Sequence, residues 1–168
     1  MGPEEEELLK RIARGDQAAL ERLYGDYYPR LCRFVLRITR DVELAREIIN
    51  DVFMVIWRSA RQFRGDSAVS TWILGIAYRR ALKSTSRSRS TPAPAVHADP
   101  PSDEAEARRL DLDGGLARLS AEQRATVELA YYFGYSYREI AEIMGCPENT
   151  VKTRMFHARR TLKSLLET

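Results

Sequence analysis

Residues 136–166 read SYREIAEIMGCPENTVKTRMFHARRTLKSLL and predict two helices joined by a tight turn. Ser136 and Glu139 have the spacing of a capping box, which marks the start of a short helix. Gly145 ends that helix, and Pro147 sits where the first turn of a longer helix begins. A short helix, a turn that contains glycine and a second helix form the helix-turn-helix pattern.

The second helix of this motif has two different faces. Its apolar residues recur at steps of four, three and four and form one stripe toward the core. They are Val151, Met155, Ala158 and Leu162. The opposite face carries cations, a hydroxyl and an aromatic ring, namely Lys152, Thr153, Phe156, His157, Arg160 and Lys163. Such side chains reach phosphates, guanine edges and thymine methyls, so this face suits a DNA major groove.

Phe156 is the residue that best separates this prediction from its alternative, a solvated basic helix that packs on its neighbours. A solvent-facing helix has little use for a large apolar ring. The alternative for the ring itself is a contact with the tyrosines within residues 131–135. The capped helix and the glycine turn before the basic helix favour DNA reading.

A linker divides the chain. Residues 84–107 read STSRSRSTPAPAVHADPPSDEAEA, contain four of the seven prolines and have no apolar periodicity. This composition is typical of a segment that is extended or disordered when free. We therefore expect two small domains, at residues 1–86 and 108–168, joined by a flexible linker at residues 87–107.

The residues on both sides of the linker read as helices. Residues 18–39 carry apolar side chains at steps of three and four, and Pro29 predicts a kink or a new helix start. Asp41 is a suitable N-cap for the next helix, and a third helix is expected at residues 70–83 after a turn. Ser120 begins another capping box. No repeat and no convincing strand are present, so the predicted fold is all-α.

The charges fall into zones. The 168 residues are 44% apolar, and 27 basic against 24 acidic residues give a net charge of +3. Residues 67–98 hold five cations and no acid, and residues 148–163 hold five cations and one acid. Between them, residues 99–113 hold six acids and two cations. Two basic zones separated by an acidic stretch predict contacts with a polyanion at two places.

The predicted helix at residues 70–83 carries the second candidate site. Most of its circumference is apolar, but Trp72, Arg79 and Lys83 form one stripe. Aromatic rings stack on unpaired bases and cations hold phosphates, so the stripe suits single-stranded nucleic acid. Core packing is the alternative for Trp72, and a solvated face is the alternative for the two cations.

The sequence carries no signature of an enzyme or a metal site. There is no glycine-rich phosphate loop, no metal-ligand spacing and no GxSxG. Cys32 and Cys146 lie far apart and outside any CxxC, which predicts two thiols in a reducing compartment. No apolar run is long enough for a membrane span and no signal peptide is present. We expect a cytoplasmic protein with no cofactor, no metal and no direct membrane insertion.

Three segments outside the linker carry a family resemblance. They are AREIINDVF at 45–53 with Trp57, FRGDSAVSTW at 63–72 with Ile76 and Ala77, and LSAEQR, YREIA, TVKTR and AR at 119–124, 137–141, 150–154 and 158–159. With these segments in this order, the chain resembles a bacterial RNA polymerase sigma factor of the extracytoplasmic-function (ECF, group IV) type. In that family the first segment binds core polymerase, the second reads the −10 promoter element and the third reads the −35 element.

The resemblance implies no enzyme. It implies a factor that directs promoter-specific transcription initiation by core RNA polymerase, reading the −35 element as duplex and the −10 element as a melted strand with a flipped base. The implied polymerase-binding residues are Glu47, Ile48, Asn50, Asp51, Phe53 and Trp57. The implied −10 residues are Asp66, Ser67, Ser70, Thr71, Trp72, Arg79 and Lys83. The implied −35 residues are Thr150, Lys152, Thr153, Arg154, Phe156, His157, Arg159 and Arg160. The implied partners are core polymerase, promoter DNA and an anti-sigma factor.

Two positions depart from the usual pattern of the family. Arg79 stands where asparagine is frequent near the base pocket, which puts the identity of the flipped base in doubt. His157 stands where arginine is commonest, and a neutral histidine makes a weaker guanine contact than a bidentate arginine. The −35 preference is therefore expected to differ at that position.

Two other functions remain as alternatives. A stand-alone helix-turn-helix regulator would bind a duplex operator by itself, as a dimer on two half-sites, but no dimerisation element is visible. A polymerase adaptor or decoy would bind polymerase without opening a promoter. The basic and aromatic faces argue against the adaptor.

Overall fold

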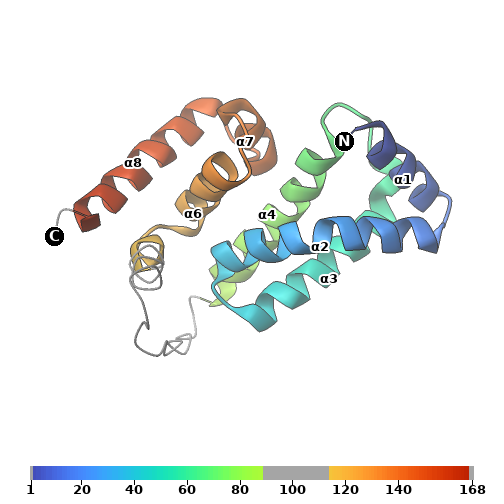
Figure 1. Ribbon diagram of the computed structural model, residues 1–168, viewed down its shortest axis with the longest axis horizontal. Coiled ribbons are helices and arrows are strands. Elements are labelled where there is room, and N and C mark those ends of the chain that lie inside the picture. Colours follow the sequence, from blue (N-terminus) through green and yellow to red (C-terminus); the bar gives the residue numbers. More distant parts are fainter. Residues whose placement is uncertain (1, 89–113, 167–168) are drawn as a thin grey trace.

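The computed structural model describes residues 2–88 and 114–166, and all regular structure within these two ranges is helical (Figure 1). The helices are α1 (Pro3–Ala13), α2 (Gln17–Thr39), α3 (Val42–Ser59), the 3-10 turn η1 (Ala60–Gln62), α4 (Val69–Ser88), α6 (Ala121–Val127), the π-helical turn η2 (Glu128–Tyr132), α7 (Tyr137–Met144) and α8 (Glu148–Leu166). The prediction of an all-α chain with two helical domains is confirmed. The predicted linker beyond Ser88 lies outside the described residues.

The N-terminal domain packs α2, α3 and α4 against one another, and α1 lies against α2 and η1. Its core contains the fully buried side chains of Leu23, Phe34, Ile49 and Ile73. α1 is a helix that the periodicity did not predict. Its end signals are nevertheless present, because a proline opens it, glutamates fill its first turn and cations fill its last turn.

Two boundaries differ from the sequence prediction. α2 runs unbroken through Pro29, so no new helix starts there. Proline has no N–H to donate, so the carbonyl of Gly25 one turn earlier lacks its helical hydrogen bond. Gly25 is exposed, so water can hydrogen-bond to this carbonyl instead. α4 continues to Ser88 instead of ending near residue 83. The hydroxyl of Thr85 donates to the carbonyl of Leu82 at 2.9 Å, and no proline interrupts this part of the chain.

The C-terminal domain begins its helices at the predicted capping boxes. The hydroxyl of Ser136 accepts from the backbone N–H of Glu139 at 3.3 Å, and the Glu139 carboxylate accepts from the Ser136 N–H at 2.8 Å. The same exchange joins Ser120 and Gln123. Gly145 ends α7 with φ 63°, a left-handed conformation that costs glycine little. The predicted helix-turn-helix geometry of α7 and α8 is therefore present.

The two domains lie against each other. α6 packs on α2, and α7 packs on α4. Figure 1 shows α6 and α7 beside α4. One continuous apolar core includes Leu74 and Ala77 from α4 together with Ile140 and Ile143 from α7. Gly75 lies at this contact, where a Cβ atom would lie 3.4 Å from the carbonyl oxygen of Ile143.

Candidate nucleic-acid and polymerase interfaces

α8 separates its apolar and basic faces as predicted. Val151, Met155 and Ala158 are at most 1% exposed and anchor the helix to its own domain. The opposite side exposes the predicted reading residues Lys152, Thr153, Phe156, His157, Arg159 and Arg160. This surface is therefore accessible to a ligand.

Phe156 is 62% exposed, and its ring lies 5.5 Å from that of His157, centroid to centroid. The expected alternative, a contact with the tyrosines that precede α7, is not among the ring contacts of the described residues. Lys152 pairs with Glu148 at 3.0 Å across an exposed turn of the helix. Such exposed pairs contribute little to stability, so the lysine can exchange this partner for a phosphate.

Two predicted −35 residues are less exposed than the others. Arg154 is half-buried and donates to the sulfur of Cys146 at 3.5 Å. Burial raises the pKa of Tyr78, and the charge of Arg154 opposes that rise. Thr150 is also half-buried, at the start of α8.

The predicted −10 residues gather around the bend between η1 and α4. Asp66 is exposed in this bend, Ser67 and Ser70 are half-buried, and Thr71 is only 5% exposed. The burial of Thr71 keeps its side chain from an incoming base in this conformation. Arg79 and Lys83 are exposed further along α4.

The sequence left two roles open for Trp72, stacking on a base and packing in the core, and its position is compatible with both. Its indole is half-buried and packs on Phe63, with 5.4 Å between ring centroids. Part of the ring therefore serves the core, and the remainder lies at the surface beside the bend. Phe63 belongs to the resembling segment, but no pattern of neighbouring residues singles it out.

The predicted polymerase-binding helix α3 borders an apolar hollow of about 630 Å³. Of the predicted residues, Glu47, Asn50 and Asp51 are exposed, Trp57 is half-buried, and Ile48 and Phe53 are buried at 3% and 6% exposure. The hollow is lined by Asn50, Phe53 and Trp57 together with Leu20, Tyr24 and Met54, which the sequence analysis did not select. Met54 is 49% exposed, so a large apolar side chain is available to a partner.

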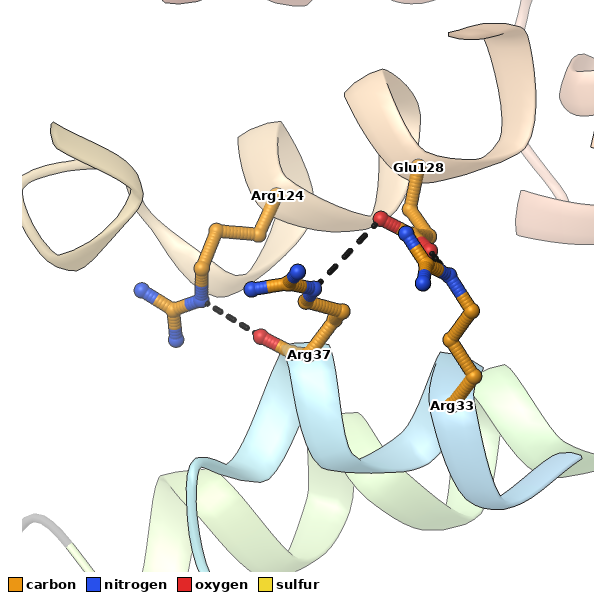
Figure 2. Close-up of polar contacts among 4 residues, drawn as sticks. All are labelled: Arg33, Arg37, Arg124 and Glu128. Atoms are coloured by element: carbon orange, nitrogen blue, oxygen red, sulfur yellow. Dashed lines mark hydrogen bonds and ion pairs between the residues drawn. The ribbon is translucent and has the colours of Figure 1, made fainter. Parts of the chain in front are cut away.

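The contact between the domains contains a buried carboxylate that the sequence did not reveal. Glu128 is 7% exposed, and its two carboxylate oxygens face Arg33 and Arg37 of α2 (Figure 2). Arg33 donates to one oxygen, and Arg37 lies 3.8 Å from the other. Arg33 also lies over the ring of Tyr132, 3.3 Å from its centroid. At helical spacing these arginines resemble any solvated basic face, so no local signal could have identified them.

Comparison with known proteins identifies the family. Residues 23–91 match the family model for Sigma-70 region 2, and residues 109–162 match that for Sigma-70, region 4. The ECF RNA polymerase sigma factor SigK of Mycobacterium tuberculosis is 32% identical to this chain, over 95% of the chain and 92% of SigK. The chain belongs to the ECF RNA polymerase sigma factors. The resemblance seen in its three segments is therefore confirmed, and this sigma factor is a transcription initiation factor that directs RNA polymerase to promoters.

Solved structures share the fold of this sigma factor. CnrH in complex with the cytosolic domain of CnrY matches with a TM-score of 0.75 at 20% identity, over 98% of this chain and 97% of CnrH. The sigma factor RpoE from Bartonella quintana, in complex with the anti-sigma factor NepR, matches with a TM-score of 0.70 at 25% identity, over 88% of this chain and 96% of RpoE. Among the described residues of this sigma factor, no helix has the length and apolar content to span a bilayer.

Proposed function

We propose that this sigma factor reads the −35 element as duplex with α8 and the −10 element as a melted strand with α4 and the bend before it. The proposal rests chiefly on the exposed face of α8, where the ring of Phe156 is 62% exposed among cations. The assigned domains are residues 1–86 for polymerase and the −10 element, and residues 108–168 for the −35 element.

The −35 contact would combine positioning and base recognition. Lys152 and Arg160 project from the exposed side of α8 and reach phosphates or guanine edges. Phe156 and the methyl group of Thr153 offer apolar contacts to thymine methyls. His157 stands where the family most often has arginine, and it offers one donor instead of the two of a bidentate guanidinium. We therefore expect weaker discrimination at the base that His157 faces.

The −10 contact would use the bend and Trp72 to hold an unstacked base. The indole packs against Phe63 at an interplanar angle of 60°, and its exposed part offers a stacking surface. Flipping a base costs a few kcal/mol, so contacts elsewhere must offset that cost. The contacts with polymerase and with the −35 element would provide the free energy that offsets this cost. One chain therefore carries a polymerase surface, a −10 surface and a −35 surface.

Core polymerase would dock on α3 and the apolar hollow beside it. Met54 and Trp57 offer the apolar area, and Glu47 and Asn50 offer a polar rim. An apolar centre with a polar rim is the usual anatomy of a protein interface. The anti-sigma factor bound to the related RpoE supports a partner of the same kind for this protein.

Reconstituted transcription tests the proposal. The purified protein is mixed with sigma-free core polymerase on a library of randomised promoters, and the transcripts are sequenced. Shared −35 and −10 elements upstream of the starts are the expected result. An absence of transcripts, together with tight binding of the free protein to duplex DNA, would favour a stand-alone regulator.

Two variants assign the −35 surface. Lys152→Ala and Arg160→Ala should reduce −35-dependent transcription and leave core binding unchanged, whereas Lys10→Ala on α1 should change neither. An equal loss of core binding would contradict the assignment of α8. Trp72→Ala should leave closed complexes intact and reduce permanganate reactivity of the −10 thymines.

A further inference from the structure

A π-helical turn places two tyrosines on the surface shortly before the helix-turn-helix. The turn η2 spans Glu128–Tyr132, and its residues Tyr131 and Tyr132 are 64% and 57% exposed. π-helical turns are rare, and many of them lie at functional sites. Tyrosine has an apolar ring and a polar tip and is enriched where proteins bind other molecules. The exposure of these rings therefore directs attention to what they contact on the surface.

Tyr131 contacts α8 through Arg159. The Nε atom of Arg159 donates to the phenol oxygen of Tyr131 at 2.8 Å, and the centre of the guanidinium lies 5.6 Å from the centroid of the same ring. The two residues are 28 positions apart in the sequence, and both side chains are exposed. Water competes for an exposed hydrogen bond, so this one contributes little to folding. Its effect is to orient the guanidinium.

The bond to Tyr131 occupies the Nε–H donor of Arg159 and not the terminal nitrogens of the guanidinium. Arginine has five N–H donors in a planar fork, and the donors on its two terminal nitrogens match the oxygens of a phosphate group. A guanidinium that is already held in one orientation loses less conformational entropy when it binds a ligand. Arg159 therefore has the chemistry and the support that a phosphate contact needs.

Arg159 lies at the margin of the exposed face of α8. Phe156 is near the middle of that face, and at about 100° per residue the side chain of Arg159 lies about 60° from it around the helix. This displacement is toward the buried Met155, which marks the edge of the core stripe. A helix in the major groove has a phosphate backbone along each side, so a cation at its margin meets phosphates rather than base edges.

We propose that Tyr131 is a positioning residue for promoter binding, which holds Arg159 so that its terminal nitrogens bind one backbone phosphate beside the −35 element. This inference rests on the proposed function, because it requires duplex DNA along α8. A phosphate carries no sequence information. The site therefore adds affinity and fixes the register of α8 on the duplex, and it leaves the preferred −35 sequence unchanged.

Promoter fragments with single neutral phosphates test the site. Methylphosphonates replace the phosphates of the −35 region one at a time, and the affinity of the complete holoenzyme is measured for each fragment. The wild type should lose affinity at one position where Arg159→Ala loses none. Tyr131→Phe keeps the ring and removes the hydrogen-bond acceptor, so its loss at that position should be smaller than that of the wild type. Identical patterns for the wild type and Arg159→Ala overturn the site.

The unmodified promoter gives the magnitudes. Tyr131→Phe should weaken holoenzyme binding about fivefold, as expected for one hydrogen bond. Arg159→Ala should reduce the slope of log affinity against log salt concentration by about 0.9, because one phosphate contact is lost. Tyr132→Phe is the matched control, since it removes the neighbouring phenol and keeps the ring on which Arg33 lies, and it should bind like the wild type.

A double variant separates positioning from an independent contact of Tyr131. If Tyr131 acts through Arg159, adding Tyr131→Phe to Arg159→Ala should weaken binding no further. The same fivefold loss in both backgrounds would overturn the positioning role. So would wild-type affinity of Tyr131→Phe on every fragment.

Phe156→Ala distinguishes failure of this site from failure of the proposed function. If Phe156→Ala weakens promoter binding and Tyr131→Phe and Arg159→Ala do not, the site is overturned and −35 reading by α8 stands. If only Tyr131→Phe and Arg159→Ala weaken it, the phosphate site stands and base reading by α8 is overturned. If none of the three variants weakens it, both proposals are overturned.

Discussion

Replacing Arg124 by alanine should destabilise the whole protein because it removes a cap that one domain supplies to the other. The lost bonds to the Arg37 and Ile38 carbonyls measure 2.9 and 2.8 Å. A hydrogen bond to a charged group contributes about 1.5–3 kcal/mol. Arg124 is half-buried rather than buried, so water can reach the vacated carbonyls and the lower figure applies. The two bonds to α2 alone give a loss of about 3 kcal/mol, and the bond to the Leu119 carbonyl within the same domain is lost with them.

Urea unfolding followed by circular dichroism measures this loss. With a slope of about 2 kcal/mol per molar urea, the midpoint should fall by about 1.5 M. Arg124→Lys keeps the positive charge but lacks the forked N–H donors of arginine. Its urea midpoint should lie between those of Arg124→Ala and the wild type. Arg118→Ala, an exposed change in the same domain, should stay within about 0.5 kcal/mol of the wild type. An Arg124→Ala protein as stable as Arg118→Ala would refute the capping role.

Four further changes probe separate parts of the molecule. Phe156→Ala should leave stability unchanged because the ring is 62% exposed, and it should reduce −35-dependent transcription roughly tenfold, since a base contact discriminates by about 1–3 kcal/mol. Met54→Glu should weaken core binding in a pull-down assay without affecting the melting temperature, because it places a charge beside the apolar hollow. Ser136→Ala removes a capping box and should cost about 1 kcal/mol in urea unfolding. Burial, aided by the hydrogen bond to Glu5, raises the pKa of Tyr27, so the folded state favours the neutral phenol and stability should fall as the pH rises above about 10. Tyr27→Phe should reduce that alkaline loss, and an unchanged pH profile would contradict it.

Features encoded by neighbouring residues could be predicted from the sequence. The capping boxes at Ser120 and Ser136 and the turn at Gly145 each depend on a few consecutive side chains, and all three are present. The two faces of α8 follow from helical periodicity alone. Residue types and spacing were sufficient here because the stabilising partners lie within one helical turn.

Features that depend on distant partners could not be predicted. Glu128 and Arg33 lie 95 positions apart, and Arg124 and Ile38 lie 86 apart. The side chains of Glu128, Arg33 and Arg124 do not differ locally from solvated ones, and Ile38 contributes only a backbone carbonyl. The depth of Thr71 and the apolar hollow beside Met54 likewise depend on how helices pack, which periodicity does not specify.

The continuous core shared by the two domains has a consequence for the turnover of the protein. A small domain buries a smaller fraction of its surface than a large one and is correspondingly marginal in stability. Side chains such as Ile140 and Ile143 are fully buried only while α7 remains on α4. Proteases cleave chains that open locally, in proportion to how often they open. Any molecule whose domains separate therefore exposes these side chains, and proteolysis should remove it sooner than the packed protein.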